Sequence, residues 1–181
     1  GGSNNLGTLS VASAPGAGAS FSTVEVLNDG GDLTIGTVDG ISGIQDASTV
    51  RIESAGNLTV DAPAAASQLL RLTAGNSSTI RLNDILTAPT VLLAANEITD
   101  QPAPPLPQVA DIFATTLGLI GRQGEAPDPV ITLNGANQVA NLAMVPENDG
   151  SQFGSVSFNN AGDLTVVGGT IDGENFETRR T

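Results

Sequence analysis

Two stretches rich in glycine and aspartate are the first candidates for chemistry in this sequence. They read GGDLTI at 30–35 and GGTIDG at 168–173. Calcium-binding β-solenoids repeat Gly-Gly-x-Gly-x-Asp in tandem, so that successive turns hold each ion between them. Neither stretch has that spacing and neither is in tandem, which predicts ordinary turns and no metal or cofactor site. An adventitious calcium ion at Asp29 and Asp32, or at Asp172 and Glu174, is the alternative.

Three other acidic residues are candidates for the cleavage of polysaccharides. Asp111, Glu125 and Asp128 lie in or beside segments rich in proline and glycine, and glycosidase sites use pairs of carboxylates. The chain has no His and no Tyr, and all six of its basic residues are Arg. A Ser-His-Asp triad is therefore impossible, and no phosphate-binding Gly-Lys-Ser/Thr loop is present. We predict that the protein is not an enzyme and has no catalytic residues, with a polysaccharide lyase or hydrolase as the less favoured alternative.

The charge of the chain excludes two classes of partner. The formal net charge is −13, whereas nucleic acids and anionic membrane surfaces attract clustered basic residues. Here the basic residues Arg51, Arg71, Arg81 and Arg122 are scattered along the sequence. We predict that they form ordinary surface ion pairs, with Glu53 on the same strand face as Arg51.

The sequence carries few signals of processing. It has no cysteine, which rules out a disulfide framework and mildly favours an exported bacterial protein. The opening GGSNNLGTLS lacks the basic and apolar regions of a signal peptide, and no apolar run is long enough for a membrane span. We therefore expect a mature or excised piece. Two sequons, at Asn57 and Asn76, match the glycosylation pattern, but Asn57 is already explained by a turn.

Short runs of β-branched and aliphatic residues recur along the whole chain, separated by Gly, Asn, Asp and Ser. Most runs have four to seven residues and alternate apolar with polar positions, which is the pattern of strands. Equivalent apolar positions such as Leu33, Leu58 and Ile80 recur at intervals of 25 and 22 residues. Such a period, with hardly any helical pattern, indicates an all-β fold, a right-handed parallel β-helix with coils of about 20–25 residues.

One short motif appears three times, and we expect each copy to form a corner that leads the chain into a strand of the next coil. Its copies, around Leu33, Leu58 and Leu164, read Gly-Asp/Asn-Leu-Thr-Ile/Val. We expect the glycine to form a corner, the leucine and the residue two positions later to face the bore, and the threonine to face outward. The residues expected in the bore after the leucines are Ile35, Val60 and Val166.

The regular succession of strand-like segments is interrupted between residues 99 and 130. This region contains the proline-rich TDQPAPPLPQ, the ambiguous stretch 109–121 and a second Pro/Gly-rich segment. Proline cannot pair as an interior strand, so we predict a single solenoid domain over 1–181, interrupted by a loop excursion at 99–130. One short helix is possible at 61–72.

Several pieces of the sequence resemble a known family. The runs Leu133-Asn134-Gly135-Ala136-Asn137-Gln138-Val139 and Phe158-Asn159-Asn160-Ala161-Gly162-Asp163-Leu164-Thr165-Val166, and VLLAANEITD at 91–100, are similar to coils of bacterial filamentous-haemagglutinin-like exoproteins. The resemblance implies a β-helical shaft in a secreted or cell-surface adhesin exported by a two-partner system. The family's Asn-Pro-Asn secretion motif does not occur, so this part resembles shaft.

The expected function is accordingly structural and adhesive. We expect the solenoid to present binding regions to a host-cell receptor or glycan, with neighbouring coils or further copies of itself as additional partners. The alternative is a carbohydrate- or receptor-binding module that uses the 99–130 loop. The scarcity of aromatic residues, 3% of the chain, favours the structural interpretation, because sugar sites commonly use aromatic platforms.

Overall fold

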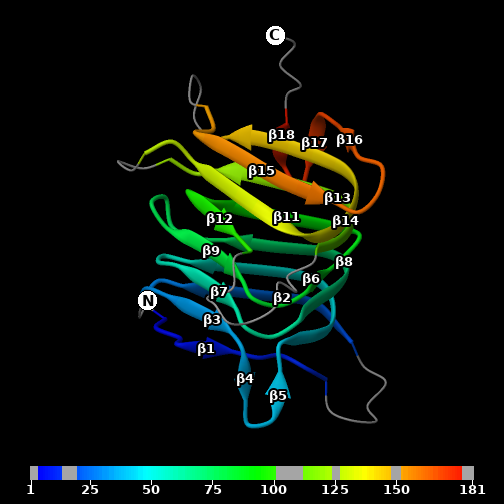
Figure 1. The fold of residues 1–181 in the computed structure, drawn as a ribbon. Helices are drawn as coiled ribbons and strands as arrows, with labels where there is room; N and C mark the ends of the chain where they lie inside the picture. The colour runs from blue at the N-terminus through cyan, green and yellow to red at the C-terminus, as the bar shows by residue number, and fades with distance from the viewer. Residues whose placement is uncertain (1–3, 14–19, 101–111, 124–126, 148–151, 177–181) are drawn as a thin grey trace.

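The computed structural model describes residues 4–13, 20–100, 112–123, 127–147 and 152–176. Within them the chain is an all-β parallel β-solenoid of about five turns, with no helix (Figure 1). In these residues no helix is therefore present that could cross a membrane. The predicted fold class is confirmed, and the right-handed sense of the winding stays a prediction.

Two ladders of strands make up the solenoid. The first contains β1 (Thr8–Leu9), β3 (Leu33–Ile35), β7 (Leu58–Val60), β9 (Thr79–Leu82), β12 (Glu97–Thr99), β14 (Val130–Pro146) and β15 (Ser155–Asn160). The second contains β2 (Phe21–Asn28), β6 (Ile44–Ser54), β8 (Ala64–Thr73), β10 (Leu86–Thr87), β11 (Thr90–Ala95), β13 (Ile112–Gly121), the later part of β14, and β16 (Thr165–Val166). Among the described residues every pairing between coils is parallel. Within this part of the chain only two short hairpins are antiparallel, β4–β5 (Thr37–Val38, Ile41–Ser42) and β17–β18 (Gly169–Ile171, Glu174–Phe176).

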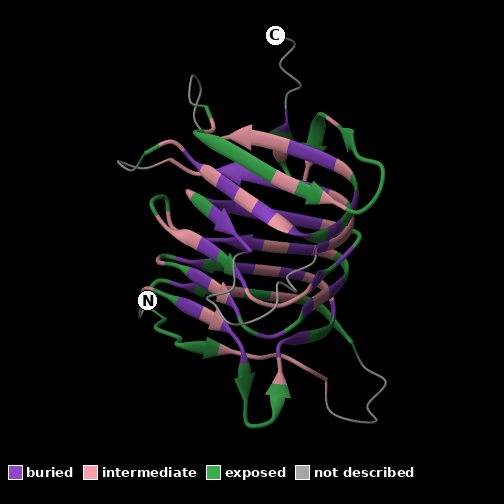
Figure 2. Ribbon diagram, viewed as in Figure 1, coloured by how far each residue is buried: buried purple, intermediate pink, exposed green. Residues whose placement is uncertain are grey.

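Stacked aliphatic side chains fill the bore. In the first ladder Leu33, Leu58, Ile80, Ile98 and Ile131 are aligned by the strand register, and each is almost fully buried. The second ladder aligns Val50, Leu70, Val91, Leu117 and Leu142 in the same way. Figure 2 shows the resulting alternation of buried and less buried positions along the strands. Burying each such side chain contributes about 1.5–3 kcal/mol, so the ladders account for much of the stability.

The repeated motif forms corners that are hydrogen-bonded from coil to coil. The side chain of Asp32 accepts a hydrogen bond from the backbone N–H of Asn57 at 2.8 Å, and the side chain of Asn57 accepts one from Thr79 at 2.9 Å. Gly31 has a φ of +125°, a conformation that favours glycine. The predicted roles of the first two copies, including buried Leu33 and Leu58, are confirmed.

The third copy does not repeat this geometry. Leu164 is 36% exposed, so the prediction that it faces the bore is wrong. The copy leads into β16 of the second ladder, where Val166 aligns with Leu142, whereas the first two copies lead into the first ladder. Among the described residues β16 is the last strand of its ladder, so Val166 stays 62% exposed although it aligns with a residue of the bore.

Two ambiguous segments prove to be strands. The possible helix at 61–72 is mostly β8, and the stretch 109–121 contains β13, whose Leu117 and Leu119 are buried in the core. The region 99–130 is therefore not one continuous excursion, because β13 is a strand of the solenoid. Its residues 101–111 and 124–126 lie outside the described part of the chain.

The coils also vary more in length than predicted. Successive residues of the first ladder, Ile80, Ile98 and Ile131, are separated first by 18 and then by 33 residues (98 − 80 and 131 − 98). The longer interval contains the proline-rich segment. Both intervals end at aligned positions of the first ladder, so the strand register is kept although the number of residues per coil differs.

A groove beside the C-terminal hairpin as the candidate functional site

The most unusual surface of the solenoid is the outer face of the second ladder, where the hairpin β17–β18 packs. The hairpin turns at Asp172 and Gly173, whose φ values are 48° and 85°. Both central residues of a type I′ turn need positive φ, and Asp-Gly is a favoured pair for it. The hairpin therefore forms locally, and side chains on both of its faces become available for packing.

Phe176 anchors the hairpin to the outer face. It is 1% exposed and packs with Leu92, Ala94, Ile120 and Ala143, which project outward from β11, β13 and β14. The strand β13 leaves room for the ring because residue 118 is glycine. A Cβ on Gly118 would lie 3.0 Å from Cζ of Phe176 and 2.2 Å from a methyl carbon of Leu92. A glycine inside a strand often marks such a close approach.

Ion pairs hold the turn of the hairpin. Asp172 pairs with both Arg51 and Arg71, and Glu174 accepts a hydrogen bond from Arg71 at 2.7 Å. Partial burial acts to lower the pKa of Arg71, but the hydrogen bonds and charges of Glu174 and Asp172 outweigh it, so this pKa lies above its ordinary value. Arg71 therefore remains charged at any pH at which the protein is expected to work.

These contacts bear on the expected partner of Arg51 and on the alternative of a calcium ion. Arg51 pairs with Asp172, a residue 121 positions away, and not with its neighbour Glu53. The proposed calcium pair Asp172 and Glu174 is occupied by guanidinium groups. At the other proposed pair, Asp32 accepts the corner hydrogen bond described above, and the described residues contain no cluster of three or more metal-ligating side chains.

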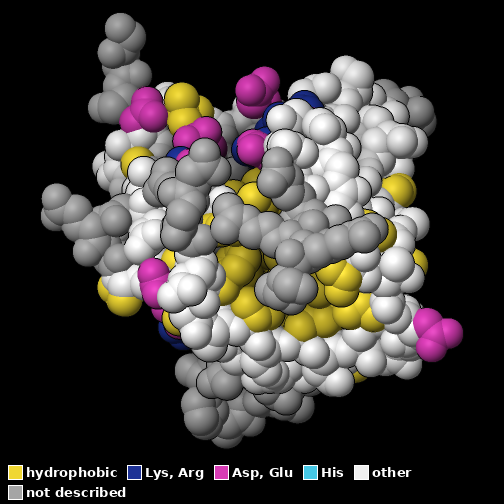
Figure 3. Space-filling view, turned by 90° about the horizontal axis from the view of Figure 1, so that it is seen from above, with side chains coloured by type: hydrophobic (Ala, Val, Ile, Leu, Met, Phe, Trp, Pro, Cys, Tyr) yellow, Lys and Arg dark blue, Asp and Glu magenta, His cyan; other side chains and the backbone are white. Residues whose placement is uncertain are grey.

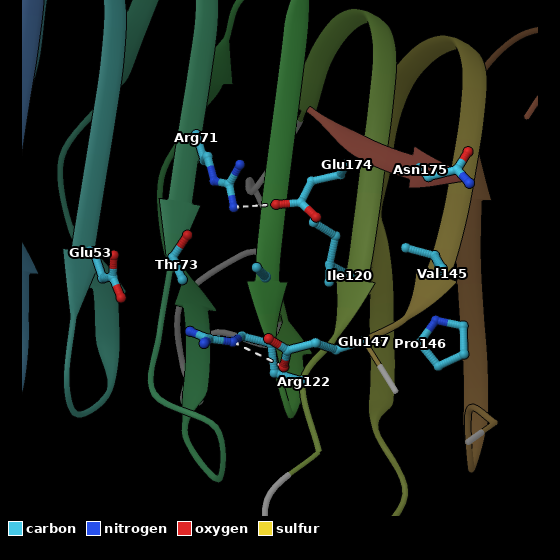
Figure 4. Close-up of a pocket in the computed structure, with 11 residues that line it drawn as sticks. Glu53, Arg71, Thr73, Ile120, Arg122, Val145, Pro146, Glu147, Glu174 and Asn175 are labelled. Atoms are coloured by element: carbon cyan, nitrogen blue, oxygen red, sulfur yellow. Dashed lines mark hydrogen bonds and ion pairs between the residues drawn. The ribbon is translucent and has the colours of Figure 1, made fainter. Parts of the chain in front are cut away.

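A groove lies between β18 and a second ion pair on the same face (Figure 4). Arg122 pairs with Glu147 at 3.3 Å and donates a second hydrogen bond to the carbonyl of Ala74 at 2.8 Å. The groove has a volume of about 300 Å³. Its floor is formed by outward side chains in register across four strands, Thr73, Ala94, Ile120 and Val145.

Glu53 extends this row of side chains by one strand, because it is in register with Thr73. It is exposed, and within the described residues it has no hydrogen-bond or ion-pair partner. Glu53 also lines a second hollow, of about 250 Å³, together with Arg51 and Glu25. The groove thus has a largely apolar floor, two arginines that are each paired with a glutamate, and the unpaired carboxylate of Glu53 at one end.

The carboxylates singled out for polysaccharide cleavage do not meet in this groove. Asp111 and Glu125 lie outside the described residues. Asp128 accepts a hydrogen bond from Gln123 at 3.2 Å and does not line the groove. Asn57, the first sequon, has the turn role expected of it, since its side-chain oxygen accepts the N–H of Thr79.

Two strands of this face contain a sequence signal for a covering element. A strand with one face in water alternates apolar and polar residues, whereas Val91–Ala95 and Leu117–Ile120 are apolar or glycine throughout. Continuous apolar runs indicate strands covered on both faces. The pattern could therefore have predicted a covering element, although not which segment supplies it. In comparisons with known proteins, no family model, no curated protein and no solved structure matches the chain.

Proposed function

We propose that this chain is a segment of rigid shaft in a secreted or cell-surface bacterial exoprotein of the filamentous-haemagglutinin-like kind. One observation carries the proposal: among the described residues, the last strand of each ladder has an exposed apolar residue in register with the bore. Val156 aligns with buried Ile131 but is 40% exposed, and Val166 is exposed above Leu142. Figure 3, viewed from above, shows hydrophobic side chains gathered at this end.

A further coil of the same kind is the natural neighbour of such an end. The strands β15 and β16 have partners on one side only within the described residues, and parallel pairing would continue both ladders. The motifs around Leu133 and Phe158 that resemble exoprotein coils lie next to this end. Stacking of coils would make the element long, straight and laterally stiff, which suits a spacer.

The partners follow from this mechanical role. Adjacent coils, of the same chain or of another copy, would contact the ends. A host-cell receptor or glycan would be bound by regions that the shaft holds away from the cell. The shaft itself needs no catalytic residue and no cofactor for this task.

The length of the element gives the experiment. Within the described residues the first ladder has seven strands, so at about 4.8 Å per step the chain contributes about 30 Å of axis. We would join one, two or four copies between an outer-membrane anchor and a fluorescent epitope, and measure the height of the epitope above the cell surface. The matched control is a Gly/Ser linker with the same number of residues.

The joined solenoid copies and the Gly/Ser linker should give different epitope heights. The height should rise in proportion to the number of copies for the solenoid, and roughly as the square root of length for the linker. A Leu70→Asp variant, which puts a charge into the bore, should behave like the linker. Equal heights for solenoid and linker would refute the proposal.

A further inference from the structure

We propose that the groove beside β18 binds an extended, basic peptide segment of another protein, which pairs with the outer edge of β18 as a third strand of the hairpin. This inference concerns the side of the solenoid and goes beyond the role of the shaft.

The first argument is the free edge of β18. In the hairpin Ile171 pairs with Glu174 and Thr170 pairs with Asn175. In a hairpin with a two-residue turn, the residues that flank the turn exchange both backbone hydrogen bonds, and the next pair does not. The backbone N–H and C=O of Asn175 therefore point away from β17, toward the groove that Asn175 lines. Such an edge can accept an added strand.

The second argument is the direction and size of the floor. In Figure 4 β18 crosses the strands of the solenoid, so a partner strand would lie along the row formed by Thr73, Ala94, Ile120 and Val145. Three steps of about 4.8 Å give a floor of about 14 Å, the length of about four extended residues. Alternate side chains of the peptide would face this floor, and small aliphatic side chains fit it.

The third argument is charge. The groove contains Arg71 and Arg122, each paired with a glutamate, Glu174 and Glu147, that also lines it. Glu53 adds an unpaired carboxylate, so the lining carries two positive and three negative groups. The chain as a whole has a net charge of −13, which would attract a cationic ligand over longer distances.

The direction of the peptide follows from these positions. The strand β18 runs from Glu174, on the side of the groove nearer Glu53, toward Asn175, above Val145 (Figure 4). Antiparallel pairing is slightly more stable per residue than parallel pairing. An antiparallel peptide would therefore bring its C-terminal residue to Glu53, where a lysine would find its partner.

The test uses the whole chain and a defined probe, the blocked peptide acetyl-Val-Thr-Val-Thr-Lys-amide, in which the two valines and the lysine share one face of the strand. Binding is measured by calorimetry at low salt. Asn175→Pro removes the N–H that faces the groove but no hydrogen bond of the hairpin, and proline is tolerated on an edge strand. It should weaken binding by about 10-fold. Thermal unfolding of this variant should resemble that of the parent chain.

A charge exchange provides a second variant that does not depend on the backbone. Glu53→Lys should weaken binding of the lysine peptide by about 5-fold or more, and it should bind better than the parent chain to the peptide with Glu in place of Lys. Glu25→Gln removes a negative charge from the same face outside the groove, and it should change the affinity less than about 2-fold.

Each outcome decides the proposal. Weaker binding by Asn175→Pro together with reversed preference in Glu53→Lys supports it. No detectable binding of the lysine peptide, or binding that both variants leave unchanged, overturns it. Loss of affinity in Glu25→Gln equal to that in Glu53→Lys would also overturn it, because the attraction would then be non-specific.

Discussion

Replacing Phe176 with alanine should release the C-terminal hairpin while leaving the solenoid folded. The ring is 1% exposed, and removal of a fully buried Phe costs about 3–5 kcal/mol where the surrounding structure cannot separate from it. Here the hairpin can separate. Its other contacts include the packing of Ile171 against the same apolar cluster and the ion pairs of Asp172 and Glu174, at side chains between 15% and 39% exposed. Each such pair contributes about 0.2–1 kcal/mol.

The measured loss should therefore be limited to the free energy with which the hairpin docks, about 2–3 kcal/mol from the transfer of the ring. Hydrogen exchange followed by mass spectrometry should show faster exchange over 169–176 and unchanged protection in β8 and β11. The matched control is Phe21→Ala, which removes the same ring from a position that is 41% exposed and should leave the hairpin protected. Unchanged exchange over 169–176 would refute the anchoring role of Phe176, and loss of protection throughout β8 and β11 would refute the independence of the solenoid.

Four further outcomes are expected. Leu70→Ala should cost about 2–5 kcal/mol of unfolding free energy in urea, and Leu27→Ala, at a side chain 48% exposed, less than about 1 kcal/mol. Asn57→Ala should lower stability by about 0.5–1.5 kcal/mol, whereas Asn57→Asp, which keeps the acceptor for the next coil, should cost less. Asp100 is 1% exposed. One of its carboxylate oxygens has no hydrogen-bond partner, and the other accepts the backbone N–H of Gly135 at 2.6 Å. Asp100→Asn should therefore be more stable than Asp100→Ala, which leaves that N–H unsatisfied. Because the pKa of Arg71 is raised, its contribution is fully present below its unfolded pKa and is lost only as the pH rises through its higher folded pKa. Protection of the hairpin should therefore not change between pH 7 and pH 10 on account of Arg71.

Local patterns in the sequence predict most of the solenoid. Alternation places Val50 and Ile52 in the bore, and the spacing between Leu33, Leu58 and Ile80 sets the coils, because each depends on residues within one turn of the chain. The same local logic failed for Leu164, whose motif matches that of Leu33 but lies at the end of a ladder. Position in the stack decides burial there, and a short motif does not contain that information.

The candidate groove was out of reach for a similar reason. Its walls depend on contacts between Arg51 or Arg71 and Asp172, which lie 121 and 101 residues apart. A scattered arginine and an Asp-Gly turn are both common features when each is considered alone. Only the winding of the solenoid brings the arginine and the turn together. The reason for a glycine at position 118 is likewise clear only from the position of the Phe176 ring, which packs against it.

The unequal coils around Ile98 have a consequence for how such a protein can change. The interval of 33 residues and the interval of 18 residues both end at aligned positions of the first ladder. The entropic free-energy cost of closing the longer coil is greater by only about 0.5 kcal/mol. New residues can thus be inserted between two strands of a ladder with little loss of stability, as long as the aligned strands keep their spacing along the axis. A solenoid of this type would acquire new surface features by lengthening a single coil, while its neighbours above and below remain undisturbed.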